Sequence, residues 1–152
     1  MKDENCIFCK IAAGEAPCYK VWEDDNHMAF LSLNPNTEGF TVVIPKDHYE
    51  SYAFENDDKV LTDLVLAAKK VGKILDNSFD DVGRTGMVLE GFGVNHLHAK
   101  LFPMHGTKAD KWEPIHSNID TYFEKYQGYI SSHDSLRASE EKLAETLGKI
   151  KK

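Results

Sequence analysis

Three basic side chains alternate with apolar residues near the middle of the chain, in the stretch NHLHAKLFPMHG at residues 95–106. Because side chains on a β-strand point alternately to opposite faces, His96, His98 and Lys100 would share one face. The apolar residues between them would take the other face and pack in the core. The basic face is then either a solvent-exposed polar surface or a row of groups that lines a cleft or binds a metal.

A second candidate for chemistry is the pair Cys6-Ile-Phe-Cys9 near the N-terminus. Cysteines with two residues between them can bind one metal ion within a single turn of chain. The same spacing also occurs in redox pairs, and two small buried cysteines would give it without any chemistry. Cys18 has no partner at a useful spacing and is interpreted as a small buried hydrophobic residue.

Several short β-rich runs bounded by turn residues, with one long helix between them, must position these groups. The strand candidates are residues 20–23 and 27–31, the stretch EGFTVVI ending at Ile44, residues 85–89, and HLHAKLF ending before Pro103. The helix starts at Asp57 or Asp58, and its apolar stripe contains Val60, Leu61, Leu64, Val65, Ala68, Val71, Ile74 and Leu75. This order predicts an α+β fold with a mainly antiparallel sheet.

The chain after Gly106 is polar and rich in aromatic residues, and it closes with a predicted helix in SEEKLAETLGKIKK. Acidic residues at the start of this helix and lysines at its end suit the helix dipole. The aromatic stretch DTYFEKYQGYISSHD is expected to cover hydrophobic surface, although its rings could also stack a base. We assign no functional residue there.

Composition narrows the possible functions. The chain has 152 residues, 41% of them hydrophobic, which suits one domain, and its net charge of −7 argues against a broad nucleic-acid-binding surface. No apolar run reaches the roughly 18 residues of a membrane span, and the polar N-terminus lacks a signal-peptide core. Three cysteines do not suggest a disulfide framework, so a cytoplasmic location is expected.

With these landmarks in place, the sequence resembles the histidine-triad (HIT) superfamily of nucleotide hydrolases and transferases. The resemblance runs from CIFCKIAAGEAPCYK through KVWEDDNHMAFLSLNPNTEGFTVVIPKDH and the helix to HLHAKLFP. It implies an α+β HIT-like fold with a five-stranded, mainly antiparallel sheet, one long helix and a homodimeric assembly. We therefore expect a HIT-like domain at residues 1–106 and a C-terminal extension at 107–152 that packs on the same domain or on a partner subunit.

In this family the middle histidine of His-φ-His-φ-His-φ-φ, where φ is apolar, is the nucleophile, and His98 takes that place. Neutral imidazole can attack phosphorus through one ring nitrogen while a backbone carbonyl holds the other, protonated nitrogen. The resemblance thus implies a covalent nucleotidyl-histidine that passes its nucleotide to water or to another acceptor.

The chain departs from the family at several positions around the expected nucleophile. Lysine replaces the third histidine, and Lys100 is expected to contact a phosphate oxygen as a point charge. His105 is a candidate to protonate the leaving group instead. Gly91 and Gly93 are expected to allow close backbone approach to a phosphate.

Three further departures carry no basic or acidic group. Phe40, Ser32 and Leu89 stand where many family members have histidine, a ribose contact and asparagine. They indicate either packing drift or a changed substrate, and we favour the changed substrate.

Some bacterial members, and the uridylyltransferase branch, complete the cysteine pair with two histidines. The corresponding positions here are His48 in IPKDH and His96, the first histidine of the strand. The resemblance therefore implies a structural zinc ion held by Cys6, Cys9, His48 and His96, with no open coordination position.

Together these observations predict a nucleoside-phosphate hydrolase or nucleotidyltransferase with His98 as nucleophile. Its partner would be a small nucleotide-type substrate, with neither nucleic acid nor membrane involved. Loss of the third histidine leaves a second hypothesis, a catalytically weakened nucleotide-binding or sensing protein of the same fold. A third is a zinc-stabilised interaction module with the aromatic tail as its partner surface.

Overall fold

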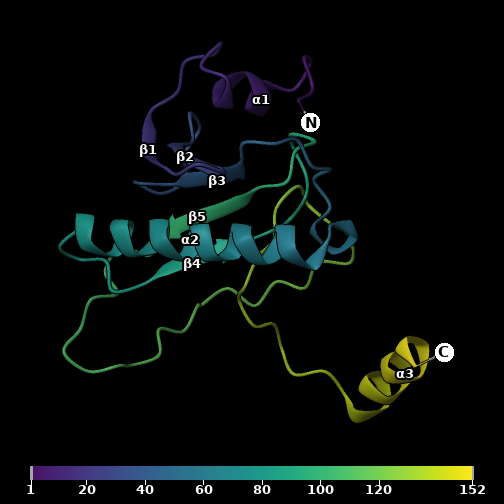
Figure 1. The fold of residues 1–152 in the computed structure, drawn as a ribbon. Coiled ribbons are helices and arrows are strands. Elements are labelled where there is room, and N and C mark those ends of the chain that lie inside the picture. Colours follow the sequence, from purple (N-terminus) through teal and green to yellow (C-terminus); the bar gives the residue numbers. More distant parts are fainter. Residues whose placement is uncertain (1, 152) are drawn as a thin grey trace. The chain divides into compact units, whose positions relative to one another are not determined.

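The protein is described by a computed structural model that covers residues 2–151 and divides into two compact units, one ending at Asp110 and one beginning at Lys111. The first unit contains the sheet, both predicted chemical motifs and the helices α1 and α2 (Figure 1). The α+β class expected from the sequence is confirmed.

The first unit is built on a five-stranded sheet in which every neighbouring pair of strands is antiparallel. Its strands, in spatial order, are β1 (Lys20–Glu23), β2 (His27–Leu31), β3 (Thr41–Pro45), β5 (Ala99–Pro103) and β4 (Thr85–Val88). β5 is inserted between β3 and β4, so the histidine-containing segment enters the middle of the sheet.

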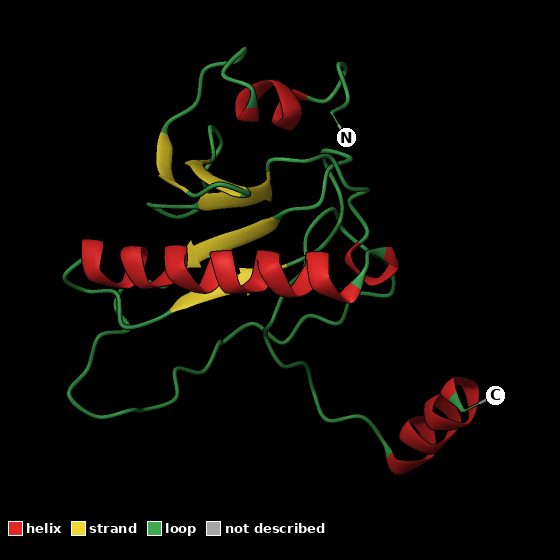
Figure 2. Ribbon diagram, in the orientation of Figure 1, coloured by secondary structure: helices red, strands yellow, loops and turns green. Residues whose placement is uncertain are grey.

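The two faces of the sheet are covered by different helices (Figure 2). α2 (Asp58–Ser78) packs on one face through buried Leu64, Ala67, Ala68, Val71 and Leu75. Leu97, Ala99 and Leu101 join this core, as their alternation predicts. The short helix α1 (Ile7–Ala12) packs on the opposite face, and the 3₁₀ helix η1 (Ala53–Glu55) precedes α2.

The histidines differ from their predicted place in the strand. β5 begins only at Ala99, three residues later than the predicted run. The backbone N–H of Leu97 donates to the carbonyl of Tyr49 at 2.7 Å, and that of His96 donates to the carbonyl of Val94 at 2.8 Å. These bonds hold the chain outside the ladder, so His96 and His98 lie at the entrance to the strand.

The second unit contains α3 (Glu140–Ile150), and no helix or strand occurs between Lys111 and Ser139. The Ser139 hydroxyl caps α3 by accepting the backbone N–H of Lys142 at 3.2 Å. The apolar stripe of α3, Leu143, Leu147 and Ile150, is exposed. Packing of the C-terminal extension on the first domain or on a partner subunit stays a prediction.

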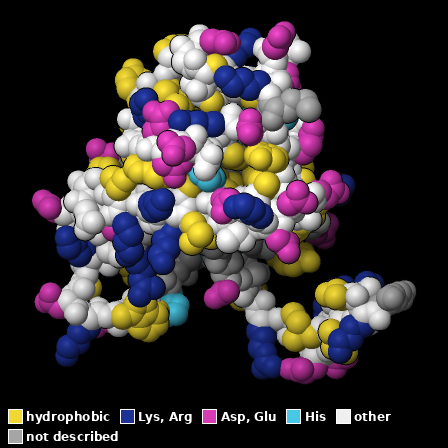
Figure 3. All heavy atoms as spheres, in the orientation of Figure 1, with side chains coloured by type: hydrophobic (Ala, Val, Ile, Leu, Met, Phe, Trp, Pro, Cys, Tyr) yellow, Lys and Arg dark blue, Asp and Glu magenta, His cyan; other side chains and the backbone are white. Residues whose placement is uncertain are grey.

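Acidic and basic side chains are interspersed on the face drawn in Figure 3. Among residues 2–151, no helix combines the length and the apolar character needed to cross a membrane.

Two leucines of α2, separated by one residue, provide a test of this core. Leu64 is fully buried whereas Leu66 is 51% exposed. Leu64→Ala should lower the free energy of unfolding by about 2–5 kcal/mol, because it leaves a cavity between helix and sheet. Leu66→Ala should change it by less than about 0.5 kcal/mol. Urea unfolding of both variants measures the difference, and equal effects would contradict the assigned helix face.

Candidate active site and metal centre

His98 is held by its own chain in one orientation. Its ring is buried, and Nδ1 lies 2.7 Å from the carbonyl oxygen of His96. Since a carbonyl only accepts, Nδ1 carries the proton, and Nε2 is left with the lone pair. Burial lowers the pKa of His98, which favours the neutral ring. The arrangement supplies a neutral imidazole with one defined basic nitrogen.

A cavity of about 460 Å³ opens beside His98, on the sheet face that α1 covers. Most of its lining is apolar and comes from α1, the sheet and the residue before β3: Ile7, Phe8, Ile11, Phe30, Val42 and Phe40. Polar groups are few and include Ser32 and Asn34. A largely apolar cleft with a small set of polar groups is typical of small-molecule sites.

Of the three apolar or neutral positions that depart from the family pattern, two lie at the cavity and one lies in the core. Ser32 and Phe40 line the cavity, whereas Leu89 packs against the core on the α2 side. Phe40 also contacts Phe102, with ring centroids 4.5 Å apart. A changed substrate could therefore account for the residue types at Ser32 and Phe40, whereas core packing accounts for Leu89.

Lys100 lines the same cavity and forms an ion pair that the sequence did not suggest. Its Nζ donates to Oε1 of Glu90 at 3.0 Å, and both side chains are largely buried. β4 and β5 place Val88 opposite Lys100, so Glu90 follows two residues beyond that pair. An acidic residue at the end of a strand was the available signal, but the register that brings it to Lys100 is not evident from sequence.

The two glycines have different surroundings. Both adopt positive φ, +74° at Gly91 and +97° at Gly93, which favours glycine at each position. Gly93 lines the cavity and has open space where a Cβ would stand. Gly91 is not among the lining residues; a Cβ there would lie 3.2 Å from the carbonyl oxygen of Ser51. Close packing with Ser51 therefore explains Gly91 without a phosphate.

His105 is engaged away from the cavity, so the structure does not support its candidacy as a proton donor to the leaving group. Its Nδ1 lies 3.0 Å from a carboxylate oxygen of Asp81, and its Nε2 lies 3.1 Å from the carbonyl oxygen of Glu38. Both ring nitrogens thus face acceptors, and the protonated ring can donate to both.

The four predicted metal ligands lie together. One ligand atom from each of Cys6, Cys9, His48 and His96 falls within 4.8 Å of every other. Nδ1 of His96 is 3.4 Å from Sγ of Cys6 and 3.6 Å from Sγ of Cys9, and Nδ1 of His48 is 3.4 Å from Sγ of Cys9. Such a Cys₂His₂ group could hold a metal ion.

Hydrogen bonds orient these side chains in a way that suits a metal. Nε2 of His96 donates to the carbonyl of Pro45 at 2.9 Å, so Nδ1, the nitrogen facing the thiols, is unprotonated. Burial lowers the pKa of His96 to about 4, which keeps the ring neutral. Burial raises the pKa of the Cys9 thiol, and a bound cation would favour its thiolate.

His96 connects the metal centre to the candidate nucleophile. Its imidazole belongs to the Cys₂His₂ group, while its carbonyl accepts the Nδ1 proton of His98. The ring of Phe8 contacts both histidines edge-on, with centroids 5.8 Å from His96 and 5.6 Å from His98. The α1 segment, which the sequence did not predict as a helix, supplies two candidate metal ligands, Cys6 at its N-cap and Cys9, and part of the cavity wall.

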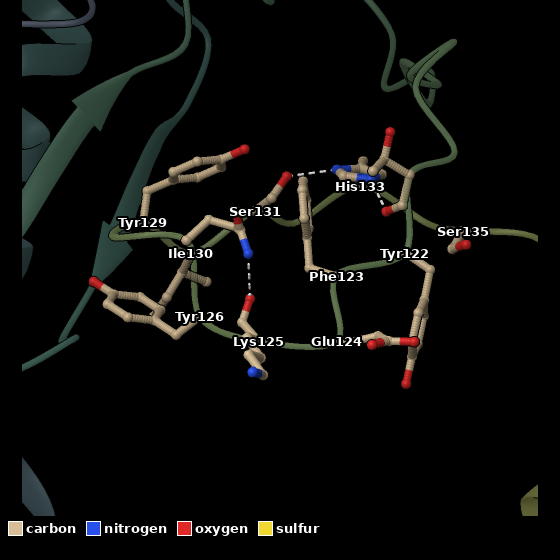
Figure 4. Close-up of a pocket in the computed structure, with 12 residues that line it drawn as sticks. Tyr122, Phe123, Glu124, Lys125, Tyr126, Tyr129, Ile130, Ser131, His133 and Ser135 are labelled. Carbon is tan, nitrogen blue, oxygen red and sulfur yellow. Dashed lines mark hydrogen bonds between the residues drawn. The ribbon is translucent and has the colours of Figure 1, made fainter.

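The second unit contains a separate hollow of about 400 Å³, bordered by Tyr122, Phe123, Tyr126 and Tyr129 (Figure 4). His133 is turned toward Ser131, and its Nε2 donates to the Thr121 carbonyl at 2.9 Å. Except for His133, which is half-buried, the residues around this hollow are exposed, so it provides little enclosed surface for a base.

Comparison with known proteins establishes the family. The HIT domain model matches residues 13–107, which is most of the first unit. The chain belongs to the HIT family, as the resemblance in the sequence implied.

Individual relatives agree with this assignment. Protein hit from Bacillus subtilis is 34% identical over 125 residues, covering 73% of this chain and 86% of that protein. Adenosine 5′-monophosphoramidase HNT1 from Candida albicans is 30% identical over 154 residues, covering 96% and 93%. The structure of a histidine triad protein from Clostridium difficile superposes with a TM-score of 0.60 at 33% identity, covering 74% of this chain and all of that one.

The contacts of His105 predict its titration. Hydrogen bonding to Asp81, and then to the Glu38 carbonyl, raises the pKa of His105 above its ordinary value of about 6.5. The protonated ring should therefore stabilise the fold at pH values below the ordinary value. This stabilisation should be lost as the pH rises through the raised value.

A proton NMR titration of the His105 ring measures this pKa. Asp81→Asn should lower it, whereas Asp80→Asn, the same change at the neighbouring residue, should leave it in place. An unchanged pKa in Asp81→Asn would contradict the assigned pair.

Proposed function

We propose that the protein is a hydrolase or nucleotidyltransferase that acts on a nucleotide conjugate through a covalent nucleotidyl-histidine at His98. The observation that carries the proposal is the 2.7 Å bond between Nδ1 of His98 and the His96 carbonyl, beside a largely apolar cavity. The relative named adenosine 5′-monophosphoramidase supports a nucleotide conjugate as substrate class.

In the proposed reaction, Nε2 of His98 attacks the phosphorus, and the bond from phosphorus to the leaving group breaks. The leaving group departs with the bonding electron pair and takes up a proton from solvent, and the acceptor releases a proton to solvent in the second step. The positive charge that develops on the ring is stabilised by the Nδ1–H bond to the His96 carbonyl. Water or another acceptor then attacks the same phosphorus and restores the imidazole. In-line transfer of this kind depends mainly on positioning and on charge stabilisation.

Lys100 and the backbone at Gly93 are the proposed phosphate contacts, since both line the cavity with His98. The apolar walls are suited to a nucleobase and ribose, with Asn34 and Ser32 as nearby polar groups. Gly91 is proposed to shape the loop rather than to bind the substrate.

We propose that zinc occupies the Cys₂His₂ group and has a structural role. Tetrahedral zinc with Zn–S of about 2.3 Å and Zn–N of about 2.0–2.1 Å places S and N ligands about 3.6 Å apart. The observed S···N distances of 3.4–3.6 Å fit that geometry. Four protein ligands leave zinc no open position. It would supply a fixed link between α1 and the segment that carries His98.

The homodimer implied by the family resemblance and the cytoplasmic location expected from the cysteine content are part of the same proposal. A second candidate, a nucleotide-binding protein with weakened chemistry, is favoured by one observation: the Lys100–Glu90 pair engages the cation at the third motif position. The two candidates differ in whether a covalent intermediate forms.

The covalent intermediate is directly testable. Incubation with nucleoside phosphoramidates, dinucleoside polyphosphates and nucleotide sugars, followed by an alkaline quench, should give product and a nucleotidyl mass adduct. His98→Ala should abolish the adduct and lower turnover by at least about 1,000-fold, because the nucleophile is removed.

His116→Ala, at an exposed histidine, is the matched control and should retain both signals. Unchanged turnover in His98→Ala would refute the nucleophile. Binding without adduct or product across the panel would support the second candidate.

The metal proposal predicts about one zinc ion per chain in protein purified without chelator. Cys9→Ser should lower both the zinc content and the melting temperature, because it removes a thiolate ligand. Cys18→Ser, outside the cluster, should retain the zinc. Elemental analysis and thermal unfolding measure both, and a metal-free wild-type protein would contradict the proposal.

A further inference from the structure

The charge at the cavity is determined by one ion pair. Of the residues that line the cavity, Lys100 alone has a permanently charged side chain. Glu90 is not in the lining but pairs with Lys100 at 3.0 Å. An anion that enters the cavity therefore meets a cation already paired with a carboxylate.

Burial makes this pairing persistent. The side chain of Glu90 is 10% exposed and that of Lys100 is 21% exposed, so solvent screens their charges less than at an open surface. Lys100 is central in the sheet, opposite Val42 of β3 and Val88 of β4. Lys100 therefore has a defined position in the cavity wall, and its partner Glu90 lies directly behind that wall at 3.0 Å.

A cation that is already paired with a carboxylate discriminates between anions of different charge. The desolvation cost of an ion rises with the square of its charge, whereas its attraction to Lys100 rises only in proportion to the charge. Glu90 reduces that attraction further. We propose that Glu90 is a specificity-determining residue that makes this site select substrates with a single negative charge at the attacked phosphorus.

This inference rests on the proposed function and narrows its substrate class. A phosphorus atom joined to a nucleoside and to a neutral amine or alcohol group carries one negative charge, as in phosphoramidates and phosphodiesters. A terminal phosphate carries about two near neutral pH, since its second pKa is about 6. Conjugates of the first class should be favoured over free monophosphates.

The test compares pairs of ligands that differ by one charge. Each of the four ribonucleoside 5′-monophosphates and its methyl ester is titrated into the protein at pH 8 by calorimetry. The wild type should bind the methyl ester more tightly. Glu90→Gln should shift the ratio of the two dissociation constants toward the monophosphate by about tenfold, because it removes the opposing charge.

Lys100→Gln should shift the same ratio the other way, which keeps the proposal testable if Glu90→Gln is unstable. Glu55→Gln is the matched control, because Glu55 lies in η1 beside the core on the α2 side, and it should leave the ratio unchanged.

The possible results distinguish a failure of the role of Glu90 from a failure of the proposed function. An unchanged ratio in Glu90→Gln, with nucleotide binding intact, overturns the role of Glu90 and leaves the proposed function standing. No binding of any of the eight ligands by the wild type overturns both. A shift in Glu90→Gln toward the methyl ester also overturns the role of Glu90.

Discussion

The geometry of the candidate active site depends on the hydrogen bond from Nδ1 of His98 to the carbonyl of His96. A single bond of this kind adds only about 0.5–1.5 kcal/mol to stability. Its larger consequence is chemical, because it determines which ring nitrogen has the lone pair. His98 lines the cavity together with its apolar walls and Lys100.

The backbone carbonyl of His96 can orient His98 because packing and hydrogen bonds on both sides of it fix its own position. The neighbouring Leu97 is buried against α2 and bonds to the Tyr49 carbonyl, while the His96 ring bonds to the Pro45 carbonyl and faces the two cysteines. The cluster thereby connects α1, the end of β3 and the entrance to β5. Holding a reactive group through packed and hydrogen-bonded neighbours is a general requirement of precise active sites.

Periodicity was sufficient to predict most of the first unit. β1 and β2 have the predicted bounds, and Leu97, Ala99 and Leu101 pack where their alternation places them. The predicted start of β5 was wrong. The backbone N–H of Leu97 bonds to the carbonyl of Tyr49 instead of to a neighbouring strand, and a partner so distant in the sequence leaves no local pattern.

The site was predictable only in part. Alternation places His98 and Lys100 on the face opposite the core, and the structure puts both on the cavity. Glu90 was missed because its pairing with Lys100 depends on the register between β4 and β5. His105 was suggested by its side-chain type, but its loop directs both ring nitrogens to Asp81 and Glu38. Register and loop geometry arise from tertiary packing, which residue types alone do not determine.

The central claim is the orientation and tautomer of His98, and nitrogen NMR of the ring tests it most directly. In ¹⁵N-histidine-labelled protein at pH 8, with His98→Gln used to assign the signals, the account predicts a protonated Nδ1 and an unprotonated Nε2. The Nδ1 proton should exchange slowly with solvent because it is bonded to the His96 carbonyl. A ring protonated at Nε2 would contradict the account, since the lone pair would then face a backbone carbonyl instead of a substrate.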